Sequence, residues 1–190
     1  MILCANLTET EAFAAEAALI NAFNFIDGCE LTNLVAGHHS HEAYDVEDFD
    51  KIYGAEELVE SDITDRILVI KINKLYKRDM DDKELYNAVR GIWRASLKHV
   101  NDVDYVFGVY DSLIVAVYKP ARWFRCKDAL DRLPRQQLVI NSDNENRVFF
   151  EDDSFENGEP LDKKAKFYLG KSISKLSLNQ SAQNPITYIE

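Results

Sequence analysis

The chain has 190 residues, of which 46% are hydrophobic, and its formal net charge is −11. This length allows one full hydrophobic core and a smaller appendage, so we expect one and a half domains. No run of about 18 apolar residues occurs, and the N-terminus lacks a basic flank followed by an apolar stretch, which argues against a membrane span and a signal peptide. Cys4, Cys29 and Cys126 form no C-x-x-C pair, which favours a reducing cytoplasm over a zinc finger or a disulfide framework.

The charges are divided unevenly along the chain. Residues 1–65 contain 15 acidic side chains and one basic side chain, Lys51, whereas residues 66–190 contain 18 acidic and 21 basic ones. The two parts therefore carry net charges of −14 and +3. Such asymmetry is expected for a basic binding module masked by an acidic segment, for an acidic surface that meets a basic protein partner, or for an acidic protein with solvated faces.

An amphipathic helix is expected near the N-terminus. Residues 10–20 read T-E-A-F-A-A-E-A-A-L-I, and residues 31–37 read L-T-N-L-V-A-G. Helical spacing gives this segment one apolar stripe, and Glu16 borders it. The stripe consists of Phe13, Ala17, Ile20 and Phe23.

The two motifs resemble the C-terminal part of the GIY-YIG endonuclease domain, in the branch linked to LEM domains, where E-A-F-x-x-E-A-x-L-I leads into L-T-N-x-x-x-G. The resemblance covers about residues 2–38. It implies that Glu16 is a catalytic residue and a metal ligand for Mg²⁺ or Mn²⁺, and that Asn33 helps to organise the same site. The alternative for Glu16 is a surface glutamate on an amphipathic helix.

The resemblance is partial. The family's two tyrosine motifs and its arginine helix are not found in the sequence, so we expect this chain alone to lack a complete nuclease site. A metal site for hydrolysis needs an oxygen ligand, a positioned nucleophile and cationic help, of which Glu16 supplies only the first. An active endonuclease would need the missing half from another chain or from sequence upstream of Met1.

An acidic segment follows these motifs. Before it, His38, His39 and His41 lie within four residues and lack the helical i, i+4 spacing of metal ligands, so we expect a polar loop there. Residues 42–65 hold ten acidic side chains together with aromatic and aliphatic ones. This composition predicts a short acidic helix and a linker rather than simple disorder.

The main module is expected to span residues 66–190. A β-branched run at 67–72 predicts a central strand. A helix is expected to start at Asp79, Asp81 or Asp82 and to end at about Leu97. Its predicted apolar face consists of Leu85, Val89, Ile92, Trp93 and Leu97.

Further strands are expected in the second half of the chain. Residues 105–110 and 113–118 are separated by Asp111 and Ser112, which predicts a hairpin, and the Lys119-Pro120 pair ends its second strand. The remaining strands are predicted at residues 137–140, 147–150 and 183–189.

Five or six strands with one helix inserted early predict an α+β domain with a mixed or antiparallel curved sheet, or a small barrel. The pattern V-Y-x-x-x-x-W at 117–123 and the Q-N-P-I sequence at 183–186 are similar to a module in bacterial and phage proteins that carry a GIY-YIG-like domain. Its shape resembles the PUA-like barrels, which implies binding of RNA or modified bases.

Basic and aromatic side chains are mixed between Lys119 and Arg135. Guanidinium groups pair with phosphates and exposed aromatic rings stack on bases, so this mixture predicts binding of single-stranded or flipped-out bases. The alternative is that Trp123 and Phe124 belong to the core and the arginines only solubilise a loop. The predicted nucleic-acid-binding residues are Lys119, Arg122, Trp123, Phe124, Arg125 and Lys127. Residues that could extend this surface are Arg66, Lys71, Lys74, Lys77, Arg78, Arg90, Arg94 and Lys98.

The motifs of P-loop nucleotide hydrolases, dinucleotide-binding enzymes and common hydrolases are absent from the sequence. We expect a cytoplasmic, nucleic-acid-associated protein of bacterial or phage type without a membrane partner. Its parts would be a partial GIY-YIG-like segment (1–41), an acidic linker or helix (42–65) and an α+β recognition module (66–190). The alternative is an acidic interaction protein, such as a defence-system inhibitor, with a basic protein partner.

Overall fold

The computed structural model describes residues 7–24, 46–77, 79–132, 147–178 and 185–189. The chain divides into two compact units, Met1–Phe49 and Asp50–Glu190. Within the described ranges, no helix has the length and apolar character needed to cross a membrane. The strand predicted at 137–140, the three clustered histidines and Asn33 lie outside the described residues.

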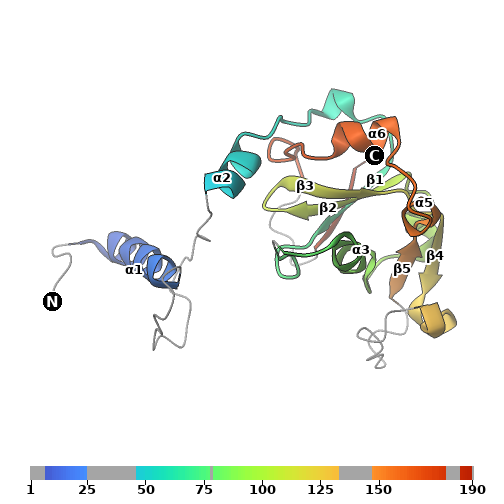
Figure 1. Ribbon diagram of the computed structural model, residues 1–190, viewed down its shortest axis with the longest axis horizontal. Helices are drawn as coiled ribbons and strands as arrows, with labels where there is room; N and C mark the ends of the chain where they lie inside the picture. Colours follow the sequence, from blue (N-terminus) through green and yellow to red (C-terminus); the bar gives the residue numbers. More distant parts are fainter. Residues whose placement is uncertain (1–6, 25–45, 78, 133–146, 179–184, 190) are drawn as a thin grey trace. The chain divides into compact units, whose positions relative to one another are not determined.

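In the smaller unit, helix α1 (Glu9–Asn24) carries the first motif (Figure 1). Thr8 and Glu11 cap its start, since the Glu11 carboxylate accepts from the Thr8 backbone N–H at 2.8 Å and the Glu11 N–H donates to the Thr8 hydroxyl at 3.4 Å. Hydrogen bonds that the Glu11 carboxylate accepts from the Thr8 backbone N–H and from the Thr8 hydroxyl, each at 2.8 Å, lower the pKa of Glu11, the backbone bond most. Ala17 and Ile20 of the predicted apolar stripe are buried, but Phe13 is only half-buried and Phe23 is exposed; Glu16 is exposed as well.

The larger unit contains a four-stranded mixed sheet in the order β3-β2-β1-β6. Strand β1 (Ile67–Lys71) is parallel to β2 (Tyr105–Tyr110) and antiparallel to β6 (Ile186–Ile189), while β3 (Leu113–Tyr118) is antiparallel to β2. Helix α3 (Asp82–Arg90) lies in the connection from β1 to β2 (Figure 1). The predicted α+β class and the early inserted helix are confirmed.

A second sheet pairs β4 (Arg122–Arg125) with β5 (Val148–Glu151) in antiparallel register. Neither sheet closes into a barrel within the described ranges, because β6 pairs with β1 and leaves β3 at the opposite end of the larger sheet. The shorter elements are α2 (Val46–Tyr53), η1 (Glu60–Asp62), α4 (Leu97–Val100), η2 (Cys126–Asp128), η3 (Leu130–Arg132), α5 (Asp153–Glu156) and α6 (Lys163–Tyr168).

The prediction of one helix as far as Leu97 is wrong in its second half. Asp81 caps α3 by accepting a hydrogen bond from the Glu84 N–H at 2.7 Å, but the helix ends at Arg90, before Gly91. Beyond the glycine, Trp93 exchanges two backbone hydrogen bonds of 2.9 Å with Val148 of β5. This pairing with the second sheet outweighs the helical pattern of the side chains.

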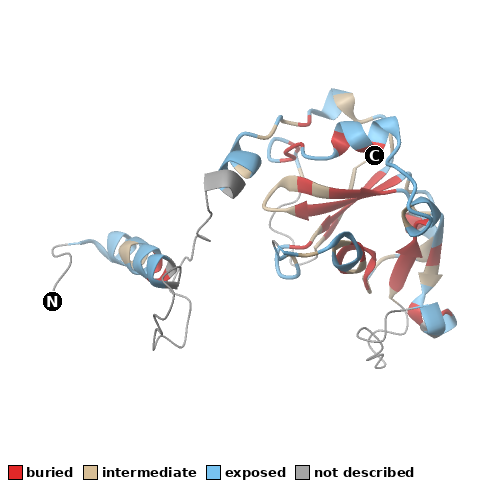
Figure 2. Cartoon of the chain, viewed as in Figure 1, coloured by how far each residue is buried: buried red, intermediate tan, exposed pale blue. Residues whose placement is uncertain are grey.

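Both faces of β1 are buried, so the apolar run at 67–72 forms the centre of the larger unit (Figure 2). Leu68 and Ile70 belong to one cluster, together with Val89 of α3 and aromatic residues of the second sheet. Ile67 and Val69 belong to the cluster on the other face, which also contains residues of α6 and of the acidic segment.

Part of the acidic segment is built into the larger unit. Leu58 is fully buried, and its backbone N–H donates to the Ser172 carbonyl at 2.8 Å, while the Ser172 N–H donates to the Glu56 carbonyl at 2.9 Å. Further along, Asp65 binds the Lys164 ammonium at 2.6 Å and accepts from the Tyr168 hydroxyl at 2.7 Å. Residues 56–65 therefore belong to the core and the edge of the larger unit.

The Asp65 contacts predict an acid-dependent stability. Burial raises the pKa of this carboxyl, but hydrogen bonds from Lys164 and Tyr168 outweigh burial and hold it below its usual value. A lowered folded-state pKa means that the contribution of Asp65 is present above the usual carboxyl pKa and is lost as pH falls through the folded-state pKa. We expect Asp65→Asn to lower the free energy of unfolding at neutral pH, with a difference from the native chain that shrinks in acid. Denaturant titrations across this range, with exposed Asp79→Asn as control, measure it; a pH-independent difference would contradict the assignment.

Close packing of α3 on β2 depends on Gly108. A Cβ atom placed there would lie 2.5 Å from Val89 Cγ2 and 3.3 Å from Ala116 Cβ. We expect Gly108→Ala to lower the free energy of unfolding by roughly 1–3 kcal/mol through overpacking. The loss should be smaller in a Val89→Ala background, where the methyl group gains room. Denaturant unfolding of the two single variants and the double variant tests this; equal losses in both backgrounds would show that Val89 is not the obstacle.

Candidate nucleic-acid interface

Two of the predicted binding residues are engaged within the protein. The Lys119 ammonium lies 3.7 Å from the Asp162 carboxylate. The Arg122 guanidinium lies 2.8 Å from Asp153 and 3.5 Å from Glu151. Both cations are exposed but partly neutralised, so they contribute less to the attraction of an anionic ligand than their sequence positions suggest.

The two predicted aromatic residues are covered. Trp123 is only 9% exposed and packs against Phe150 with ring centroids 5.0 Å apart. Phe124 is half-buried, stacks on Phe149 at 5.4 Å and lies 4.9 Å from the Arg132 guanidinium. The position of Trp123 corresponds to the core alternative that the sequence left open, and Phe124 is engaged by Phe149 and Arg132.

Three arginines gather around one position of the second sheet. Val148 pairs with Arg125 on one side and with Trp93 on the other. Because paired strands lie about 4.8 Å apart, the backbones of Arg94, Arg125 and Arg147 lie close together at this end of the second sheet. Alternation along the strands places Arg125 on the face of Val148, and Arg94 and Arg147 on the other face. Arg94 and Arg125 are exposed, Arg147 is half-buried, and none of the three has an ion pair with a described residue.

Two lysines extend this group. Lys127 lies in η2 directly after β4, and Lys98 lies in α4, which packs on β4. Both are exposed and form no ion pair with the part of the chain that the structure describes. We call the resulting set the basic surface. It consists of Arg94, Lys98, Arg125, Lys127 and Arg147.

The arginines beneath the second sheet have a structural role. The Arg90 guanidinium lies 5.1 Å from the Tyr86 ring and 5.5 Å from the Phe149 ring, and its Nη2 donates to the Arg132 carbonyl at 3.1 Å. Arg132 in turn binds the buried Glu151 carboxylate at 2.9 Å. These bonds hold η3 on the second sheet, so the buried Arg90 and the exposed Arg132 are both used within the protein.

Polar groups next to this network are also used internally. The Asp152 backbone N–H donates to the Tyr86 hydroxyl at 2.8 Å, and the Asp152 carboxylate accepts from the Lys119, Ser154 and Phe155 N–H groups. Burial raises the pKa of Asp152, although these three bonds oppose it. The carboxylate therefore organises the start of α5 and is not presented to solvent.

The residues carried over from the GIY-YIG resemblance are not brought into a site by the described part of the chain. Glu16 is exposed on α1, and Asn33 lies outside the described ranges. Among the residues that the structure describes, no group of three or more histidines, cysteines or acids is placed to hold a metal ion.

Sequence reasoning did not single out Arg147. The sequence shows only that Arg147 begins a predicted strand after a turn-rich stretch. This does not predict which residues of other segments lie beside Arg147. Arg94 and Lys98 were noted as possible extensions, but their closeness to Arg125 follows from the pairing of Trp93 with Val148.

Comparison of the chain with protein-family models, curated proteins and solved structures gave no match. Support for a binding site therefore comes from the geometry and charges of this chain.

The buried position of Trp123 predicts a mainly structural role. We expect Trp123→Ala to lower the free energy of unfolding by about 3–5 kcal/mol, because it removes a large core side chain. Trp123→Phe should cost much less, since the indole Nε1 is buried and has no hydrogen-bond partner among the described residues. Thermal and denaturant unfolding of both variants measure the difference. A stable Trp123→Ala variant with weakened nucleic-acid binding would instead support the stacking role.

Proposed function

We propose that the larger unit binds nucleic acid through the basic surface. The observation that carries the proposal is the gathering of Arg94, Arg125 and Arg147 around Val148 without ion pairs to described residues. Most other arginines in the described part of the larger unit are neutralised by nearby carboxylates. Guanidinium groups at one end of the sheet that have no ion pair with a described residue suit phosphate oxygens, which they bind through paired N–H donors.

The uneven charge of the chain is expected to determine which part of the protein faces the nucleic acid. The whole chain carries −11, and residues 1–65 carry −14, so most of the protein repels a polyanion. Only a local basic surface can then face the phosphates. Because Trp123 and Phe124 are covered, the contacts we propose are to the phosphate backbone, and they position the ligand without reading its sequence.

The sequence resemblances support the same class of ligand. Residues 2–38 resemble the GIY-YIG endonucleases, a family that acts on nucleic acid. We propose that Glu16 keeps the metal-ligand position there, for Mg²⁺ or Mn²⁺, in an incomplete site. The open mixed sheet shares the α+β class of the PUA-like modules but lacks their closed barrel in the described ranges.

A basic protein partner for the acidic residues is the second proposal, supported by the charge of residues 1–65. Part of that charge is already used within the chain. The Lys171 ammonium, whose side chain is only 8% exposed, lies 2.7 Å from the Glu56 carboxylate, and Lys164 binds Asp65. These pairs reduce the acidic charge left for a partner near residues 56–65 and favour the nucleic-acid proposal.

Fluorescence anisotropy of the full chain with labelled single-stranded and duplex DNA and RNA tests the proposal. We expect Arg94→Ala and Arg125→Ala each to weaken binding at low salt. Each should also reduce the salt slope by about 0.7 for single strands or about 0.9 for duplex DNA, the value for one phosphate contact. Lys166→Ala is the matched control, because Lys166 is exposed on α6 and likewise has no ion pair with a described residue.

Three outcomes separate the alternatives. An unchanged salt slope in Arg125→Ala, or the same loss in Lys166→Ala, would contradict binding by the basic surface. Absence of binding to every nucleic acid, combined with tight, salt-sensitive binding of a basic polypeptide such as polylysine, would favour the acidic interaction protein.

A further inference from the structure

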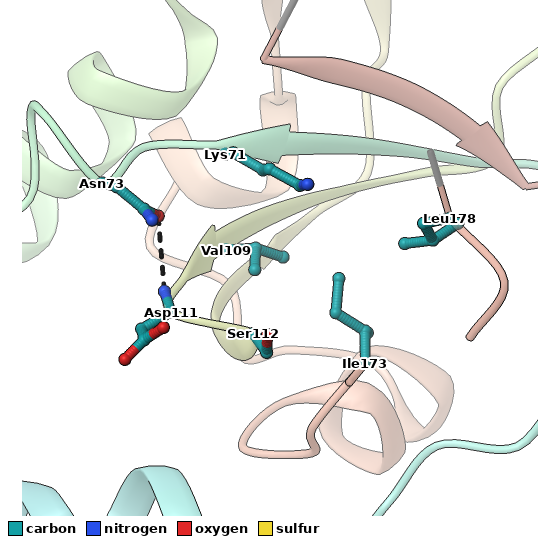
Figure 3. Close-up of a pocket in the computed structure, with 7 residues that line it drawn as sticks. All are labelled: Lys71, Asn73, Val109, Asp111, Ser112, Ile173 and Leu178. Atoms are coloured by element: carbon teal, nitrogen blue, oxygen red, sulfur yellow. Dashed lines mark hydrogen bonds between the residues drawn. The ribbon is translucent and has the colours of Figure 1, made fainter. Parts of the chain in front are cut away.

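A small cavity lies where β1 ends and the β2–β3 hairpin turns, away from the residues of the basic surface. Its volume is about 170 Å³ (Figure 3). The residues that line it are Lys71, Asn73, Val109, Asp111, Ser112, Ile173 and Leu178. Figure 3 shows the side chains of Lys71, Val109, Ile173 and Leu178 around one common space. We propose that this cavity binds a small aliphatic carboxylate.

The position of the Lys71 ammonium group supports an anionic ligand. Alternate residues of a strand face the same side, so Lys71 follows Ile67 and Val69, both of which are fully buried. The lysine thus extends a row of buried aliphatic side chains into the cavity wall. Lys71 is half-buried, yet its ammonium forms no hydrogen bond or ion pair with any residue that the structure describes. A charge at a partly desolvated position is stabilised by a nearby anion.

Two neutral donors share the cavity with Lys71. The Asp111 backbone N–H donates to Asn73 Oδ1 at 3.3 Å, which leaves the amide Nδ2 of Asn73 to donate elsewhere. The Ser112 hydroxyl has no partner among the described residues. Asp111 supplies the only carboxylate of the lining, and Figure 3 shows it pointing away from the common space. Lys71 and the Asn73 amide therefore offer donors at the cavity, and the Ser112 hydroxyl can donate as well, which suits an acceptor ligand.

The hairpin turn in the cavity wall is held by hydrogen bonds. Asp111 and Ser112 have φ angles of 43° and 69°, the left-handed values of a two-residue hairpin turn that normally favour glycine or asparagine. Two hydrogen bonds hold this strained turn, one from Asp111 to Asn73 and one of 2.8 Å from the Ile173 N–H to the Ser112 carbonyl. The backbone of Asp111 and Ser112 is thus held before a ligand arrives, which lowers the entropy cost of ordering this part of the site.

Size and lining define the ligand. The volume of 170 Å³ corresponds to only a few water molecules, each of which occupies roughly 30 Å³. It is also below the range of roughly 300–1,000 Å³ that is usual for drug-sized ligands. Val109, Ile173 and Leu178 supply apolar lining. A carboxylate that carries a short branched alkyl group suits both the donors and this lining, with its oxygens toward Lys71.

The test is a titration of the full chain with isobutyrate at constant ionic strength, followed by amide NMR shifts. We expect saturable shifts at Asn73, Ser112 and Ile173. Isobutyramide, which has the same shape without the charge, should bind at least about tenfold more weakly. Inorganic phosphate should also bind more weakly, because it lacks the alkyl group. Equal binding of isobutyramide or tighter binding of phosphate would overturn the assignment.

Variants locate the site. Lys71→Met keeps the length of the side chain and removes its charge, and we expect it to weaken isobutyrate binding at least about tenfold. Lys74→Met is the matched control, because Lys74 is exposed and does not line the cavity. Leu178→Ala should weaken isobutyrate more than acetate. Unchanged binding by a folded Lys71→Met variant would overturn the proposal, and so would equal losses in both lysine variants; thermal unfolding establishes that each variant is folded.

Discussion

Burial of both faces of β1 is the constraint on which the rest of the larger unit depends. A strand covered on both sides needs two separate layers of apolar side chains, and this chain draws them from distant segments. Val89 of α3 and Phe150 of the second sheet cover one face, while Leu58 and Tyr168 cover the other. The acidic residues around Leu58 are therefore held in place by the requirements of the core, whatever their role toward partners.

Features with strong local signals could be predicted from the sequence. The hairpin of β2 and β3 follows from two β-branched runs separated by two residues, and the start of α3 follows from the aspartates that cap helices. Features that depend on pairing between distant segments could not. The extent of α3 was overestimated because Trp93 continues the apolar periodicity but pairs with Val148. Strand β4 was overlooked for the same reason, since its four residues form a strand only beside β5.

At the candidate interface, too, local features could be predicted from the sequence, but contacts between distant segments could not. A sequence identifies which residues are cationic, but the attraction that each offers to a ligand depends on its neighbours. Arg122 and Arg125 end the same short strand, yet Arg122 meets Asp153 and Glu151, whereas Arg125 meets no carboxylate in the described ranges. The aromatic residues between them point into layers of other rings. Burial thus changes the expected mode of recognition from base stacking to contact with phosphates.

The backbone bonds between residues 56–58 and Ser172 determine where the chain can be shortened. Ser172 also pairs with Leu113 at the edge of β3, so the segment around Leu58 continues the larger sheet beyond its last regular strand. Removal of the chain up to Gly54 would leave this edge covered. Removal up to Arg66 would take Leu58 out of the core and expose the backbone groups of Ser172, which would turn a covered sheet edge into a surface on which other chains can pair and aggregate.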